Sequence, residues 1–192
     1  VGGLWSGGYA PGARVGETQV ARELGVRQEP FREELRDVGG LGIIDITSLE
    51  GARVRPASKR ELLESYEARA ELESLGARRA QGRMSDDAYE CLGDLLARMK
   101  EAATLGDMHA EARLDGAFHG RIMELSGSKT LRRVWEFLEP VSRTYITLAT
   151  AVVTPQLIED LHRPILESLR HEDSKLADDA ILKEMAKRKH NL

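Results

Sequence analysis

Cysteine, aromatic residues and long hydrophobic runs are all scarce in this sequence of 192 residues. The single thiol, Cys91, cannot form an intrachain disulfide, and no cysteine pair is available to hold a metal ion through thiolates. The longest uncharged stretch, residues 144–158, contains threonine, glutamine and proline and is shorter than the ~20 apolar residues of a membrane-spanning helix. These absences argue against a disulfide-rich secreted protein, a thiolate metal site and a membrane protein, and we expect a cytoplasmic location.

What the sequence does contain is the composition of a folded globular protein, with 41% hydrophobic and 31% charged residues and a net charge of −4. The length suits one large domain or two small ones and is ample to bury a core. The chain begins with Val1-Gly2-Gly3 and lacks both an initiator methionine and the pattern of a signal peptide. We therefore expect that residue 1 marks a truncation.

Glycine and proline separate the chain into two regions. Both are frequent up to about residue 55 and rare after Ser58, where long segments repeat apolar residues at i, i+3, i+4 and i+7. This change predicts a first domain over residues 1–56 and a second domain over residues 57–192.

The first region predicts two short helices and a hairpin. A helix over residues 17–24 stops at Gly25, and a second begins near Pro30 and ends at Gly39-Gly40. The β-branched run at residues 43–47, followed by turn residues and a return at 52–54, is typical of a small β wing.

The second region shows only helical patterns, so we expect an all-α bundle. Ser85 and Thr154 precede helical segments as capping residues, because a side-chain oxygen can accept a free backbone N–H there. The predicted helices cover residues 59–80, 85–105, 107–125, 128–153, 154–170 and 173–189.

Several blocks of sequence resemble one family of bacterial proteins. Residues 8–17 (GYAPGARVGE), 21–26 (ARELGV), 30–36 (PFREELR) and 51–54 (GARV) resemble the winged-helix domain of GntR-type transcription regulators. Residues 69–73 (RAELE), 114–119 (LDGAFH) and 161–166 (LHRPIL) resemble the helical effector domain, FCD, of the FadR-like subfamily. The blocks follow the family's order and span nearly the whole chain.

The resemblance implies a mostly α protein. Its first domain would be a winged helix-turn-helix, here with a truncated first helix, and its second an all-α antiparallel helical bundle of the FCD type. It further implies a homodimer that binds a palindromic double-stranded DNA operator and responds to a small organic acid bound in the helical domain.

The candidate DNA-reading residues lie around the second short helix. Gln28, Arg32 and Arg36 share one helical face, and glutamine and arginine can reach base edges in the major groove. The resemblance implies a DNA contact for Arg32, turn contacts for Arg27 and Gln28, and a phosphate contact for Thr18. The alternative is that these arginines are ordinary solvated residues.

The charge of the first domain does not favour DNA binding. Residues 1–58 carry seven arginines and eight acidic residues, a poor balance for a module that binds phosphates. Glu29 also stands where the family commonly has a small or polar residue. The prediction of DNA binding therefore rests on the family pattern and the wing.

A metal site is predicted in the helical domain. Asp115 and His119 lie four residues apart, so one helix face presents a carboxylate and an imidazole to a shared divalent cation. The resemblance implies that His162 is a further ligand. The family has one more histidine ligand one helix further on, and the matching position in this sequence is Glu184. A carboxylate there tilts the preference toward Mn²⁺, with Zn²⁺ and Ni²⁺ still possible. Alternatives are three ligands plus water, or a surface Asp115–His119 pair beside a core His162.

One positively charged side chain is predicted to bind the effector. Arg69 lies in the family's Arg-x-x-Leu-Glu pattern and, beside an open metal position, would bind the carboxylate of the effector. The alternative is a salt bridge from Arg69 to Glu73, four residues on. The remaining histidines, His109, His171 and His190, fit no ligand spacing, and we expect them to be exposed.

Three functions are compared. We expect a ligand-responsive regulator without enzymatic activity. A helical metal-dependent hydrolase is less favoured, because no separate general base has a suitable spacing and the winged helix would be left unexplained. A regulator that binds its ligand without a metal ion is the third possibility.

Overall fold

The computed structural model describes residues 14–15, 44–47, 51–54, 58–146, 153–171 and 173–190. The chain divides into two compact units, Val1–Ser58 and Lys59–Leu192.

A three-stranded antiparallel sheet is described in the first unit. Strand β3 (Gly51–Val54) lies between β1 (Arg14–Val15) and β2 (Ile44–Thr47), and Ile44 is paired with Val54. The predicted hairpin is thereby confirmed, whereas β1 was missed because two residues are too few to show an alternating pattern. The two helices predicted over residues 17–24 and 30–38 lie outside the described residues.

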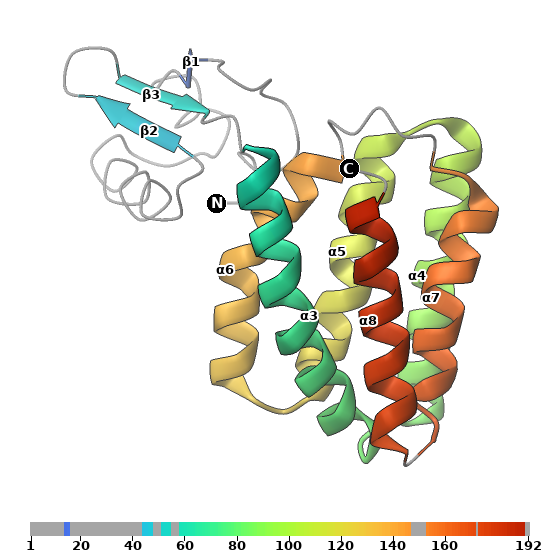
Figure 1. Cartoon of the computed structure of the whole chain (residues 1–192). Coiled ribbons are helices and arrows are strands. Elements are labelled where there is room, and N and C mark those ends of the chain that lie inside the picture. Colours follow the sequence, from blue (N-terminus) through green and yellow to red (C-terminus); the bar gives the residue numbers. More distant parts are fainter. Residues whose placement is uncertain are drawn as a thin grey trace. The chain divides into compact units, whose positions relative to one another are not determined.

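The second unit is a bundle of helices that pack against one another (Figure 1). All six predicted helices are confirmed, and each begins within one residue of its predicted start. Helix α6 is described as far as Ile146, whereas we expected it to reach residue 153, and Val153 is not helical. Residues 147–152 lie outside the described residues. The helices are α3 (Lys59–Gln81), α4 (Asp86–Leu105), α5 (Met108–Leu125), α6 (Lys129–Ile146), α7 (Pro155–Ser168) and α8 (Ser174–His190).

Side-chain caps fix the starts of three helices. The side chain of Ser85 accepts a hydrogen bond from Ala88 N at the start of α4, and Thr154 accepts from Leu157 N before α7. Asp107 caps α5 in the same way, immediately after Gly106 ends α4 with a φ of 70°. These local signals explain why the predicted helix starts agree with the structure.

Helix α5 occupies a central position in the bundle. It contacts α3, α4 and α6, while α8 packs against α3 and α7. The core is apolar and fully buried at Leu92, Phe118, Ile165 and Ile181. One face of α5 therefore points into the bundle, and this face carries the site described next. In the part of the chain that the structure describes, no helix has the length and apolar character needed to cross a bilayer.

Candidate metal and effector site

The four predicted metal ligands meet inside the bundle. Asp115 and His119 extend from α5, His162 from α7 and Glu184 from α8. One ligand atom from each lies within 4.8 Å of the corresponding atoms of the others, and all four side chains are buried. Four residues that span 69 positions of the sequence, from Asp115 to Glu184, thus form one compact group of two carboxylates and two imidazoles.

His162 has a defined orientation. Its Nδ1 lies 2.9 Å from the carbonyl oxygen of Ile158, and because a carbonyl only accepts, Nδ1 carries the proton of the neutral ring. Nε2 lies 3.0 Å from Asp115 Oδ1, and it is the ring nitrogen turned toward the other predicted ligands. A backbone carbonyl that fixes one ring nitrogen and frees the other is the usual support of a metal-binding histidine.

His119 is supported from the opposite side by a carboxylate. Its Nδ1 lies 2.7 Å from Glu73 Oε2, and its Nε2 lies 3.3 Å from Glu184 Oε1. Both contacts are ion pairs, and among the described residues neither ring nitrogen has a hydrogen-bond partner, nor does Glu184 Oε2. Since buried polar atoms are normally paired, these atoms point to a missing partner, and the donor set fits a divalent cation.

A second layer of polar residues holds Glu73 in place. Its Oε1 accepts hydrogen bonds from Arg69 Nε at 2.7 Å and from the indole Nε1 of Trp135 at 2.7 Å. Arg69 is only 2% exposed, so the structure contains the salt bridge that we weighed as the alternative role for this residue. Its contact with an effector stays a prediction.

Two charged residues of the site escaped the sequence analysis. Arg188, one turn after Glu184 on α8, donates a hydrogen bond from Nε to Glu184 Oε1 at 2.7 Å and another from Nη2 to Asp115 Oδ1. Glu111, one turn before Asp115 on α5, is also buried. The available signal was the repetition of charged residues at i and i+4 along both helices.

The buried charges shift one another's pKa values. Burial lowers the pKa of His119, but the carboxylates of Glu184 and Glu73 overcome this effect and raise it to about 10. Burial raises the pKa of Asp115, but the Arg188 guanidinium and the neighbouring histidines hold it well below its usual range. A metal ion that binds His119 must therefore displace a proton.

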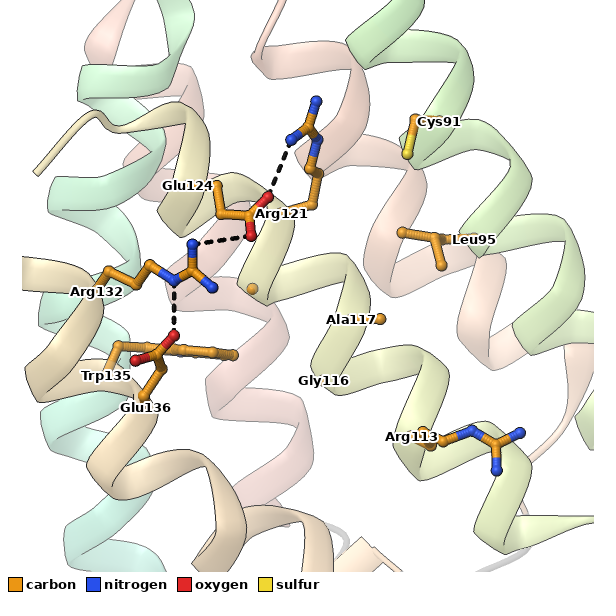
Figure 2. Close-up of a pocket in the computed structure, with 11 residues that line it drawn as sticks. Cys91, Leu95, Arg113, Gly116, Ala117, Arg121, Glu124, Arg132, Trp135 and Glu136 are labelled. Atoms are coloured by element: carbon orange, nitrogen blue, oxygen red, sulfur yellow. Dashed lines mark hydrogen bonds and ion pairs between the residues drawn. The ribbon is translucent and has the colours of Figure 1, made fainter. Parts of the chain in front are cut away.

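An open pocket, shown in Figure 2, is lined by residues of α4, α5 and α6 and contains none of the four predicted ligands. It has a volume of about 500 Å³ and includes the small residues Gly116, Ala117 and Gly120 of α5. Arg121 and Arg132 both reach the carboxylate of Glu124, each at 2.9 Å. The sequence analysis missed this pocket, although three small residues on one helix face were a signal for it.

The remaining predicted residues divide into two groups. His109 and His171 are exposed, as predicted, while the side chain of His190 lies outside the described residues. The candidate DNA-reading residues also lie outside the described residues, and they are Thr18, Arg27, Gln28, Arg32 and Arg36.

Comparison with known proteins places this geometry in context. The model of the FCD domain family matches residues 64–186. The chain is 31% identical to the probable D-xylose utilization operon transcriptional repressor of Paenarthrobacter nicotinovorans, over 91% of this chain and 77% of that protein. It is 26% identical to the gluconate operon transcriptional repressor of Bacillus subtilis, over 82% of this chain and 65% of that protein.

Solved structures share the fold. The structure of E. coli McbR/YncC superposes with a TM-score of 0.83 at 23% identity, covering 96% of this chain and 89% of the other. A putative GntR regulator from Rhodococcus sp. RHA1 superposes with a TM-score of 0.75 at 15% identity, covering 97% and 90%. At these identities the likeness concerns the fold alone.

Proposed function

The chain belongs to the GntR superfamily of transcription regulators, in the group that carries an FCD domain, and from this membership we propose that it is a ligand-responsive, DNA-binding regulator. Residues 1–56 would bind a palindromic operator, with Thr18, Arg27, Gln28, Arg32 and Arg36 as the DNA-contacting residues. Residues 57–192 would dimerise and bind a small carboxylate effector beside a divalent metal ion. Effector binding would then change DNA affinity through a coupling free energy between the two sites.

The observation that carries this proposal is the group of Asp115, His119, His162 and Glu184. Its ligand atoms lie within 4.8 Å of one another, and the nitrogens of His119 have no hydrogen-bond partner. A bound Mn²⁺, Zn²⁺ or Ni²⁺ would supply a positive centre that attracts the carboxylate of an effector.

The residues around the group support this role. Ile158 and Glu73 flank the two histidines on the sides away from the common centre, which leaves both Nε2 atoms directed toward the carboxylates. Glu73 is in turn held by Arg69 and Trp135. Supporting contacts of this kind orient the ligands before an ion arrives and raise its affinity.

One observation favours the metal-free version of the regulator as a second candidate. Arg188 already places a positive charge against Asp115 and Glu184. In that version a guanidinium, and no metal ion, provides the positive charge of the effector site.

The test is the metal content of protein purified without chelating columns, in the native sequence and in His119→Ala. We expect His119→Ala to lose its bound metal, and to lose the rise in thermal stability that small organic acids produce in the metal-loaded native protein. His109→Ala is the matched control, because His109 is an exposed histidine of the same helix, α5. Full metal occupancy in His119→Ala would contradict the proposed site.

A further inference from the structure

The guanidinium of Arg188 contacts three of the four predicted ligand residues. Arg188 Nη2 donates a hydrogen bond to Asp115 Oδ1 and lies 3.4 Å from His162 Nε2. Its Nε donates to Glu184 Oε1 at 2.7 Å. Of the four predicted ligands, only His119 has no contact with Arg188 among those that the structure describes.

These contacts place Arg188 in conflict with a divalent ion. Asp115 and Glu184 would also bind the ion, and two positive charges repel each other strongly in a site shielded from water. Arg188 Nη2 also lies 3.4 Å from His162 Nε2, a nitrogen that has only one lone pair to offer. The ion and the guanidinium therefore exclude each other from the centre of the group.

Arg188 is also the member of the group with access to solvent. Its side chain is 13% exposed, whereas the side chains of Asp115 and Glu184 are 3% and 0% exposed. It lies in the last turn of α8, where the side chain can turn outward without disturbing the middle of the bundle. The side chain of Arg188 can therefore move out toward solvent, whereas the side chains of Asp115 and Glu184 cannot.

We propose that Arg188 is an internal competitor of the metal ion, which holds Asp115 and Glu184 together until a divalent cation displaces its guanidinium. This inference rests on the proposed metal site and adds a consequence to it. Displacement removes the contact between the last turn of α8 and α5. Because α8 packs against α3, loss of this contact would bear on the packing of a helix that begins at Lys59, the first residue of the second unit.

The test compares Mn²⁺ and Zn²⁺ affinity by equilibrium dialysis in the native protein, Arg188→Gln and Arg163→Gln. Glutamine keeps a hydrogen-bond donor but removes the charge, so we expect Arg188→Gln to bind either ion about tenfold more tightly. Arg163→Gln is the matched control. Arg163 also donates to a glutamate four residues earlier, Glu159, at 2.8 Å, but it lies outside the group. Its substitution is expected to leave ion affinity unchanged.

The outcomes separate the two proposals. Equal affinity in the native protein and Arg188→Gln would overturn the competitor role and leave the metal site standing. Ion binding by Arg188→Gln alone would overturn both proposals, because the guanidinium would then never be displaced and the native regulator would hold no metal ion. Absence of binding in both proteins would overturn both proposals.

A second measurement needs no substitution and applies if Arg188→Gln fails to fold. Hydrogen exchange of the amides in the last turn of α8 is measured in the native protein with and without saturating Mn²⁺. Faster exchange with Mn²⁺ is expected, because the turn loses its contact with Asp115. Unchanged exchange in a protein that has bound Mn²⁺ would overturn the competitor role.

Discussion

Helix α5 separates two groups of charged residues that resemble each other in distance and differ in environment. On the inward side, Arg69 and Glu73 lie 2.6 Å apart with side chains 2% and 1% exposed. On the outward side, Arg121 and Glu124 lie 2.9 Å apart with side chains 39% and 36% exposed. Water screens the outer pair, whereas each inner charge depends on its partner. Distance alone therefore says little about what an ion pair contributes.

The difference also bears on function. Burying ions costs several kcal/mol each, and a buried pair often adds no more stability than apolar residues of similar size. The inner group contains Arg69, Glu73, Asp115, Glu184 and Arg188, all in the interior of one bundle. Buried ionisable groups that shift one another's pKa values are typical of binding sites. The inner side of α5 is therefore the stronger candidate for the effector site.

The contrast is tested most strongly by removing one negative charge from each side. Glu73→Gln removes the buried ion-pair partner of Arg69, and we expect the free energy of unfolding to fall by about 3–5 kcal/mol. Glu124→Gln, on the outer side, is expected to cost less than about 1 kcal/mol. Denaturant unfolding of both variants measures the two values. Similar losses would show that burial does not separate the two sides.

A second prediction concerns the pH dependence of stability on the inner side. Burial, and then the negative charge of Asp115, raise the pKa of Glu111 from 4.5 to about 7. Between these pH values the folded protein binds more protons at Glu111 than the unfolded chain does, so the free energy of unfolding falls as pH rises.

Glu111→Gln should remove this fall, which amounts to at most about 3 kcal/mol between pH 4.5 and 7. Denaturant unfolding across this range, in buffer containing a chelator, measures it. Parallel pH profiles for Glu111→Gln and the native protein would contradict the assigned burial of this carboxyl group.

The smallest effect is expected on the outer side of α5. A Cβ at Gly120 would lie 3.4 Å from the Trp135 ring, which is ordinary van der Waals contact. Gly120→Ala should therefore stabilise the protein by up to about 1 kcal/mol, because alanine favours the helix more than glycine does. Thermal unfolding measures the change. A loss of stability would mean that the outer side is packed as tightly as the inner side.

The sequence predicted the features that depend on neighbouring residues. Helix starts followed from caps such as Ser85 and Thr154, and the helices themselves from their apolar repeats. Asp115 and His119 could be paired because i and i+4 share a helix face. Glu184 was predicted as a ligand only from its position in the family's pattern, since nothing in the neighbouring sequence indicates that it lies near α5.

Contacts between helices could not be predicted in this way. The position of Arg188 depends on how α8 lies against α5, and the hydrogen bond from Trp135 to Glu73 joins residues 62 positions apart. The family's Arg-x-x-Leu-Glu pattern predicts that Arg69 binds the effector, with a salt bridge to Glu73 as the alternative, and it does not indicate how deeply α3 is buried. The environment of Arg69 depends on packing, which a local pattern does not record.

The lone thiol gives this protein a practical property. Cys91 is exposed on α4 and lines the outer pocket, and the chain contains no other cysteine. A maleimide-linked nitroxide or fluorophore would therefore attach at one known position without any substitution, on the side of α5 away from the buried ligands. In a dimer, two such labels would form a symmetric pair, and a change in the distance between them would report a rearrangement of the subunits.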